Sequence, residues 1–513
     1  MAHYQYTGSP QFVKVMIRAV ECFAKVFGPN PDQLHGYPGH PELELAVRRL
    51  YALTGDIKHL AFADYLLQAR GVAREDQGGK SYFPFEARRR NDPLFAMNLP
   101  DIDDMRYSQS HLPLNEQKTI EGHSVRAFYL LTAAADAPEF FADAKRLWED
   151  AVTKKMYVTG GFGSVSRTEG FDPVPYRLPQ STDEGGCYAE TCASIACMMA
   201  GERLLSQSLD GAVRDVVEKC LYNNVLGGGS LNGKQFSYAN KHATYGDEIA
   251  TRAEWFEVCC CPPNLSRTLG MLGGYTWSAN VDADCKIINL DVYILLSATR
   301  RIALPNNAGE ATVEMVSEMP NKGITRFNFS APEGWKWTVR LPLPGYAENV
   351  TVSVTATIDN GFQRIEVDAE DSVDLTFDLP IRLLGCHPKT NQDTLTVQRG
   401  PIIYVAESFD NPSIENKYPH FHGIGMSATA TLIEAPITIC GIEMVAIKTA
   451  DSDVYAVEVE SEDGAGNRLF PPAGNKGGRS WKMLGEGLTF VPWFARANRD
   501  DASHVRVNMI RVA

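Results

Sequence analysis

The hydrophobic pattern of this 513-residue chain changes its period once, near residue 280. Before that point apolar residues recur every three or four positions, as in "IKHLAFADYLLQARG", which predicts amphipathic helices. After it, segments such as "ITRFNFSAP" alternate apolar and polar residues and favour β-branched and aromatic side chains, which predicts strands. Because the two patterns are segregated, the sequence favours separate helical and β domains over one mixed α/β sheet.

Three domains are therefore expected: a helical domain over 1–278, a β domain over 279–395 and a second β-rich domain over 396–513. Helix pairs joined by loops that contain Gly and Pro are typical of a bundle, a solenoid or a closed α/α toroid. In the β part, Asn360 and Gly361 between two alternating runs predict a hairpin. The charged segment 84–104 predicts an irregular loop over the functional site.

Ionisable and thiol side chains gather in the turns before four of the predicted helices. These turns read "HGYPGH", "KTIEGH", "GGCYAE" and "CCCPPN". The start of a helix offers unpaired N–H donors and the positive end of the helix dipole. If alternate helices run in the same direction, the four turns open on one face, and His40, His123 and Glu190 meet the thiols there.

Net charge, hydropathy and cysteine content indicate which partners and which cellular compartment to expect. A net charge of −14 argues against nucleic acids and anionic membrane surfaces as partners. No apolar run approaches the ~18 residues of a membrane span. The first apolar stretch, "QFVKVMIRAVECFAKVF", carries charges at helical spacing, unlike a secretory signal. Eleven cysteines without an export signal indicate a reducing compartment, so we expect a cytoplasmic protein.

Three adjacent cysteines, Cys259 to Cys261, precede two prolines in "WFEVCCCPPN". Prolines are favoured in the first turn of a helix, so the thiols are expected just ahead of a helix start. The residue before a proline is disfavoured in the α region, which predicts an extended conformation for Cys261. Thiolates are stabilised at helix starts. The cluster is therefore either a site for chemistry or metal binding, or an inert group of buried cysteines.

The segment "YAETC" adds a carboxylate and a thiol, Glu190 and Cys192, at another predicted helix start. Together with a distant vicinal Cys pair they would supply ligands of the types that Zn²⁺ accepts. The spacing matches no common zinc finger. Glu190 could equally interact with the helix dipole, and Cys192 could be a core residue.

Several blocks, "YAETC", "CCPPN", "GHSVRAFYLL", "KKMYVTGGFGS" and "LPIRLLGCHP", resemble those of glycoside hydrolase family 127, whose best-known members are β-L-arabinofuranosidases. The resemblance implies an (α/α)6-barrel-like helical toroid followed by β-sandwich domains, with 279–395 as the first sandwich. Members of the family usually carry further residues before the point where this chain begins, so the toroid is either shortened at its N-terminus or incomplete.

The resemblance also implies a Zn²⁺ cofactor held by one Glu and three Cys. Carried over residue by residue, the ligands are Glu190, Cys192, Cys260 and Cys261. Cys260 would also be the nucleophile. Family members commonly have a small residue at the position of Cys259, which we therefore interpret as a packing residue.

The remaining implied site residues are an acid/base and three sugar contacts. Glu169 in "RTEGF" matches the general acid/base, with Asp172 as a nearby competitor. His40, His123 and Tyr238 match positions that face the sugar. Glu169 could instead be a loop surface charge, and each histidine could be a helix cap or a polar group with a structural partner.

The resulting hypothesis is a retaining glycoside hydrolase of carbohydrate metabolism that acts on β-L-arabinofuranosides or a related small glycoside. Two alternatives remain open. One is an epimerase- or lyase-type sugar-modifying enzyme on the same scaffold, and the other is a non-catalytic protein with a structural zinc site. The sequence is also compatible with a homodimer.

Overall fold

The computed structural model describes residues 1–91, 104–182, 184–458, 480–499 and 503–512. The chain forms two compact units and passes between them several times. The first unit consists of Met1–Tyr157, Gly161–Arg177 and Tyr188–Val217. The second unit consists of Val158–Gly160, Leu178–Cys187 and Glu218–Ala513. Among the described helices, none combines the length and the apolar character that crossing a membrane requires.

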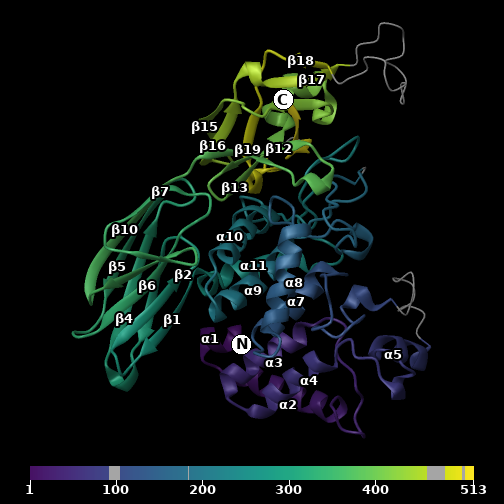
Figure 1. The fold of residues 1–513 in the computed structure, drawn as a ribbon, viewed down its shortest axis with the longest axis vertical. Helices are drawn as coiled ribbons and strands as arrows, with labels where there is room; N and C mark the ends of the chain where they lie inside the picture. The colour runs from purple at the N-terminus through teal and green to yellow at the C-terminus, as the bar shows by residue number, and fades with distance from the viewer. Residues whose placement is uncertain (92–103, 183, 459–479, 500–502, 513) are drawn as a thin grey trace. The chain divides into compact units, whose positions relative to one another are not determined.

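The first unit is helical, as the period of its apolar residues predicts (Figure 1). Its longer helices are α2 (Gln11–Val26), α3 (Glu42–Thr54), α4 (Ile57–Ala69), α5 (Tyr82–Arg90), α7 (Ser124–Ala135), α8 (Phe141–Lys154) and α9 (Thr191–Gln207). The turn between α3 and α4 shows how the sequence sets these bounds. Gly55 ends α3 with a φ of 68°, and the Asp56 side chain accepts a hydrogen bond from the Lys58 N–H to begin α4.

The segment 84–104 was expected to be irregular, and this expectation is wrong for its first part. Residues up to Arg90 lie in α5, whose acidic Glu86 pairs with Arg89 and Arg90 one turn later. Pairs at this spacing stabilise a helix, so a charged stretch does not have to be a loop. Residues 92–103 lie outside the described part of the chain.

A buried ion pair between Glu44 of α3 and Arg70 stabilises the first unit. The Arg70 Nη2 lies 2.7 Å from the Glu44 Oε1, and the two side chains are 1% and 0% exposed. Burial raises the pKa of Glu44, and the Arg70 guanidinium opposes that shift. Arg70 also donates to the carbonyl oxygens of Ser108 and Pro38. The pair therefore connects α3 to two loops.

Glu44→Ala is expected to lower the free energy of unfolding by about 3 kcal/mol, because it leaves the Arg70 charge buried without its counter-ion. Urea denaturation followed by tryptophan fluorescence measures the change. Asp76→Ala, which breaks the solvent-exposed pair with Arg74, is the matched control and should leave the midpoint unchanged. Equal midpoints for the two variants would contradict the role of the buried pair.

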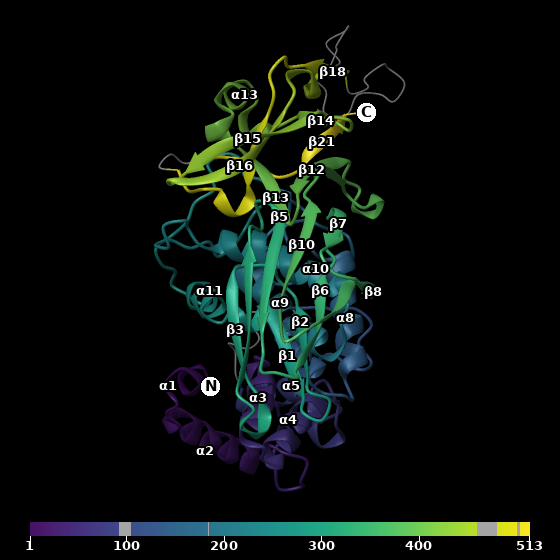
Figure 2. The ribbon, with the colours of Figure 1, turned by 90° about the vertical axis from the view of Figure 1, so that its left-hand side faces the viewer.

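The strands begin at Trp277, close to the change of period predicted near residue 280, and first form two five-stranded sheets. One has the order β1 (Trp277–Asp282), β2 (Ile287–Val292), β6 (Lys336–Pro342), β9 (Phe362–Val367) and β8 (Thr357–Asp359). The other has the order β3 (Ala298–Ala303), β4 (Glu310–Ser317), β5 (Gly323–Ser330), β10 (Glu370–Asp378) and β7 (Glu348–Val352). Apolar residues of both sheets share one core, which makes the pair a β-sandwich (Figure 2).

Two details of the sandwich follow directly from the sequence. The rings of Phe329 in β5 and Trp337 in β6 lie 5.2 Å apart between the sheets, as the alternation of apolar residues requires. Asn360 and Gly361 join β8 to β9 with φ angles of 44° and 82°. Positive φ at both positions is the signature of the predicted two-residue hairpin, which is confirmed.

A third sheet follows, in the order β15-β16-β19-β13-β12-β21-β14-β17-β18, with β11 on β12 and β20 on β13. Its strands are β11 (Ile381–Gly385), β12 (Thr394–Arg399), β13 (Ile402–Glu407), β14 (Ile424–Ser427), β15 (Leu432–Ile439), β16 (Ile442–Thr449), β17 (Val454–Glu458), β18 (Ser480–Met483), β19 (Thr489–Pro492), β20 (Val505–Arg506) and β21 (Met509–Val512). A boundary at 395 falls inside β12. The division into three domains stays a prediction.

The segment that follows α10 (Gly211–Cys220) is bound to this third sheet. The Asn223 amide donates to the Pro401 carbonyl at 2.9 Å and accepts from the Ile403 N–H at 2.7 Å. Arg252 donates to the Ala497 carbonyl at 2.9 Å, and burial lowers the pKa of this guanidinium to about 10. The segment that follows α10 is thus held by the backbone of the C-terminal, β-rich part of the chain.

Candidate active site

The starts of α3, α7 and α9 lie close together in the first unit. His123 precedes α7, and its ring centroid lies 6.4 Å from that of His40, which stands before α3. His123, Glu169 and Glu190 each offer a ligand atom within 4.8 Å of the others. The predicted convergence of helix starts is therefore confirmed for these three turns. The turn before α11 (Cys261–Gly270) belongs to the second unit.

Glu169 is held by two side chains that bind its two carboxylate oxygens separately. The His123 Nε2 lies 3.0 Å from Oε2, and the Tyr188 hydroxyl donates to Oε1 at 2.8 Å. The Glu169 side chain is one third exposed, whereas His123 is buried. A partly exposed carboxyl group with fixed partners can exchange a proton with a bound molecule.

The backbone around Glu169 fixes the carboxylate further. The residue has a φ of 49°, a left-handed conformation that is uncommon outside glycine. Its carbonyl oxygen accepts hydrogen bonds from the N–H and the hydroxyl of Ser124, at the first turn of α7. The next residue is Gly170, where a Cβ would lie only 2.6 Å from the Gly122 carbonyl oxygen. Only glycine therefore lets this turn approach the backbone of Gly122 so closely.

The competitor, Asp172, is engaged in local structure. Its Oδ1 accepts from the Val174 N–H at 2.8 Å, and its Oδ2 lies 3.4 Å from the Arg177 guanidinium. These contacts stabilise the turn that follows Glu169. The Glu169 carboxylate instead lies beside His123, so the geometry favours Glu169 over Asp172 as the candidate acid/base.

Tyr107 and Arg126 lie in the same region, and neither was predicted as a site residue. The Tyr107 ring lies 5.6 Å from that of His123, and the Arg126 guanidinium lies 4.8 Å from the Tyr107 ring centroid. Burial raises the pKa of the Tyr107 hydroxyl; Arg126 opposes this shift and Glu169 adds to it. Arg126 stands three residues after His123 in "GHSVRAFYLL", so the helical period could have placed it beside His123. No sequence signal points to Tyr107.

Glu190 and Cys192 stand at the start of α9, as predicted from "YAETC". Glu190 is the N-cap residue and is 1% exposed, and Cys192 is 2% exposed in the first turn. The Glu190 N–H donates to the Phe162 carbonyl at 3.2 Å, which fixes the chain before the helix. A buried carboxylate here faces the positive end of the dipole of a 17-residue helix.

Cys260, Cys261 and Tyr238 lie together in the second unit. The Cys260 thiol, which is exposed, donates to the Tyr238 hydroxyl oxygen at 3.1 Å, and the two Sγ atoms lie 3.8 Å apart. Cys261 is 1% exposed, and Cys259 is partly buried. The Tyr238 ring is supported by an edge contact with Phe256 at 5.6 Å. The association of Tyr238 with the vicinal thiols had not been anticipated.

The expectation that Cys261 is extended is wrong. The helix α11 begins at Cys261 itself, and Cys260 before it has φ −69° and ψ −41°, which are helical values. Pro262 and Pro263 fall in the first turn, where no hydrogen bond is lost. The preference against the α region before a proline is thus overridden by the helix start. Both thiols still lie at the N-terminal end of α11, where a thiolate is stabilised.

Residues 1–274 match the family described as β-L-arabinofuranosidase, GH127 catalytic domain, and residues 381–509 match the glycoside hydrolase family 127 C-terminal domain. The chain belongs to glycoside hydrolase family 127. It is therefore a glycoside hydrolase, as the resemblance of its sequence blocks implied. A non-reducing end β-L-arabinofuranosidase of Bifidobacterium longum subsp. longum is 29% identical over 537 residues, which cover 98% of this chain and 75% of the relative.

Two solved structures of family 127 are similar to the chain over its whole length. A β-L-arabinofuranosidase from Geobacillus stearothermophilus T6 has 27% identity and a TM-score of 0.84, with 78% of that protein covered. A β-arabinofuranosidase has 27% identity and a TM-score of 0.76, with 75% covered. These likenesses confirm the predicted fold class, a helical (α/α)6-barrel-like toroid followed by β-sandwich domains.

Proposed function

We propose that this family 127 enzyme is a retaining hydrolase of β-L-arabinofuranosides, with Cys260 as a zinc-bound nucleophile and Glu169 as the acid/base. Two relatives that resemble the chain over nearly its whole length carry the name β-L-arabinofuranosidase. The observation that carries the assignment of Glu169 is its carboxylate, held between His123 and Tyr188 at 3.0 and 2.8 Å. Cys260 supports the other half of the reaction as an exposed thiol at a helix start.

The proposed zinc ligands fit the ion by their chemistry. One carboxylate and three thiols are ligands of the types that Zn²⁺ binds, and they are contributed by Glu190, Cys192, Cys260 and Cys261. All four stand at the starts of α9 and α11, where the helix dipole favours the anionic form of each ligand. When bound, zinc supplies positive charge that keeps the thiols deprotonated at neutral pH.

The chain's own groups then perform the two steps of a retaining hydrolysis. In the first, the Cys260 sulfur attacks the anomeric carbon and forms a C–S bond as the glycosidic C–O bond breaks. Glu169 gives its proton to the departing oxygen. In the second, Glu169 takes a proton from water, the water oxygen attacks the same carbon, and the C–S bond breaks to return the thiolate. Two inversions at one carbon give net retention.

The proposed sugar contacts are His40, His123 and Tyr238. The Nδ1 of His123 is buried and has no hydrogen-bond partner among the described residues, so it is available to a sugar hydroxyl. Tyr238 touches the Cys260 thiol, which would place its hydroxyl beside the reacting carbon. A buried polar atom without a partner is costly unless a ligand supplies the partner.

A panel of 4-nitrophenyl glycosides, with the β-L-arabinofuranoside first, tests this function. We expect release of nitrophenol from that substrate, and proton NMR of the first product should show the β-anomer, as retention requires. The assay contains a reductant because oxidised thiols would imitate an inactive enzyme. An initial α-anomer would refute retention. Turnover restricted to another glycoside would refute the sugar assignment while leaving the mechanism intact.

Removal of a ligand thiol is expected to remove zinc. Cys261→Ser should lower the zinc content by about one equivalent per chain and abolish turnover, because a hydroxyl is not deprotonated at neutral pH and is a poor zinc ligand. Inductively coupled plasma mass spectrometry of the purified protein measures the content. Cys259→Ser, the neighbouring cysteine outside the proposed set, is the matched control and should keep zinc and activity. A full zinc content in Cys261→Ser would refute the ligand set.

A further inference from the structure

A second group of potential metal ligands lies in the β-rich part of the second unit. Glu415 belongs to α13 (Pro412–Lys417), His420 to the turn η9 (Pro419–Phe421), and His504 directly precedes β20. Each offers one ligand atom, and these atoms all lie within 4.8 Å of one another. The two imidazole rings are 4.2 Å apart and meet edge to face. None of the three residues belongs to the proposed catalytic set.

Two polar atoms of this group are buried and have no hydrogen-bond partner within the part of the chain that the structure describes. They are the Nδ1 of His420 and the Oε2 of Glu415. The His420 Nδ1 lies 3.9 Å from the other carboxylate oxygen, Oε1, which is too far for a hydrogen bond. That Oε1 instead accepts from the His420 N–H at 2.9 Å, so the carboxylate is oriented by the backbone. Buried atoms without partners are rare in folded proteins and call for a ligand that satisfies them.

His504 is oriented so that one ring nitrogen remains for a ligand. Its Nδ1 lies 3.1 Å from the Thr244 hydroxyl, which also accepts a hydrogen bond from the Val505 N–H at 3.0 Å. With Nδ1–H donating to that hydroxyl, Nε2 carries the lone pair. A metal-bound histidine is usually oriented in this way by a partner on its other nitrogen.

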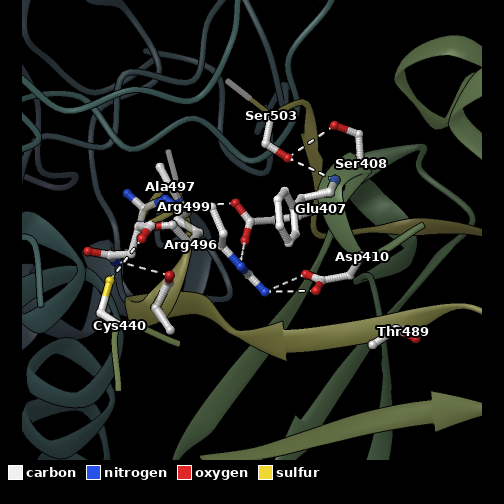
Figure 3. Close-up of polar contacts among 12 residues, drawn as sticks. Glu407, Ser408, Asp410, Cys440, Thr489, Arg496, Ala497, Arg499 and Ser503 are labelled. Atoms are coloured by element: carbon white, nitrogen blue, oxygen red, sulfur yellow. Dashed lines mark hydrogen bonds and ion pairs between the residues drawn. The ribbon is translucent and has the colours of Figure 1, made fainter. Parts of the chain in front are cut away.

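The backbone that carries His504 is fixed by a network at the end of β13 (Figure 3). The Ser408 hydroxyl accepts from the His504 N–H at 2.9 Å, and the Ser408 N–H donates to the His504 carbonyl at 3.0 Å. The Ser408 and Ser503 hydroxyls are 3.0 Å apart. Close by in the chain, Arg499 binds both oxygens of Asp410 at 2.7 and 2.8 Å. The support is therefore built from paired side chains and not from one loop alone.

The remaining ligand turn is also held in place. His420 has a φ of 62°, a left-handed conformation, and its carbonyl accepts from the Arg506 Nε at 3.2 Å. Arg506 in turn stacks on the Tyr245 ring, with 5.0 Å between its guanidinium carbon and the ring centroid. Both histidines are thus connected to the loop that contains Thr244 and Tyr245.

We propose that Glu415, His420 and His504 bind a divalent transition-metal ion, with Zn²⁺ as the occupant and water in the fourth position. Two imidazole nitrogens and one carboxylate oxygen form a donor set that zinc accepts in proteins. Ligands on a tetrahedral zinc lie about 3.4 Å apart, given bonds of about 2.1 Å, so the group needs only a small contraction. The ion connects the segment 412–421 to the last strands of the chain, and its role is to stabilise this connection.

The test counts metal in full-length variants. The chain is dialysed against a chelator, reloaded with Zn²⁺, freed of excess ion and analysed for zinc. His420→Gln and His504→Gln should each lose about one equivalent per chain relative to wild type. His422→Gln is the matched control, since His422 is exposed, lies two residues from His420 and is outside the group. It should keep the full content.

Cobalt separates this site from the catalytic thiols. Co²⁺ bound to thiolates gives a sulfur-to-metal charge-transfer absorption, which a site of nitrogen and oxygen ligands lacks. His420→Gln should therefore keep this absorption while it loses an equivalent of cobalt. Circular dichroism shows whether a histidine variant is folded. If one is not, Glu415→Gln, which preserves the shape of the side chain, replaces it and should also lose an equivalent of cobalt. An unchanged metal content in all three variants, or an equal loss in His422→Gln, would overturn the proposal.

Discussion

Cys260→Ser should lower kcat for the β-L-arabinofuranoside by at least about 10⁴-fold, the order of effect seen when a nucleophile is removed. The serine hydroxyl keeps nearly the same shape but is not ionised near neutral pH, so it cannot attack the anomeric carbon at a useful rate. Initial rates with the nitrophenyl substrate measure the loss. The change removes a proposed zinc ligand as well, so zinc content is measured on the same sample.

Two observations separate a lost nucleophile from a lost metal. Cys192→Ser removes a thiol from the proposed zinc set but leaves the proposed nucleophile, Cys260. Wild-type and Cys192→Ser protein are therefore both incubated with a slow substrate, and the covalent adduct formed on each is compared. Mass spectrometry of the wild type should find a pentosyl unit on the peptide that contains Cys260. Cys259→Ser should form the same adduct at the same rate. An adduct on another residue, or undiminished turnover in Cys260→Ser, would refute the assignment.

Glu169→Gln should lower kcat/KM by about 10²- to 10⁴-fold for substrates with a poor leaving group, because the amide cannot give a proton to the departing oxygen. The amide can still form hydrogen bonds with His123 and Tyr188, so the local structure should survive. The decisive measurement is the dependence on the leaving group. Dinitrophenyl glycosides need no protonation, and their bond-breaking step should be almost unaffected.

Asp172→Asn provides the control for this variant. Asp172 stands three residues later and caps a turn through Val174 and Arg177, so its loss should affect stability more than catalysis. We expect no change in the leaving-group dependence. If Asp172→Asn and not Glu169→Gln showed selective loss with poor leaving groups, the two carboxylates would have to exchange roles.

The sequence predicted those parts of the fold that depend on local pattern. The change of period predicted near residue 280 appears as the start of β1 at Trp277, and Asn360-Gly361 forms the expected hairpin, because both features depend on neighbouring residues. The charged α5 was missed since a charged composition alone does not distinguish a loop from a helix stabilised by ion pairs. The pairing of β11 with β12 and the order of the third sheet depend on contacts between distant strands, which periodicity does not encode.

In the candidate site, too, features set by local sequence could be predicted, and contacts between distant residues could not. Helix starts at His123 and Glu190 could be read from turn residues, and the resemblance supplied Glu169 and Cys260. What escaped prediction was the partner of each group, such as Tyr188 on Glu169, because a hydrogen bond between side chains leaves no mark on spacing. The metal-binding triad at His420 was missed for a related reason: its residues lie 84 positions apart between His420 and His504 and follow no common ligand spacing.

The attachment of the segment 218–260 to the third sheet limits how this enzyme can evolve. The approach to the vicinal thiols is held by Asn223 on the backbone of β13 and by Arg252 on the backbone near Ala497. A recombination event that exchanged the C-terminal sheet for an unrelated one would remove the acceptors of the Arg252 Nη1 and the donor to the Asn223 Oδ1, both in a buried region. We therefore expect the thiol-bearing helix and the C-terminal sheet to be inherited together, as one unit of descent.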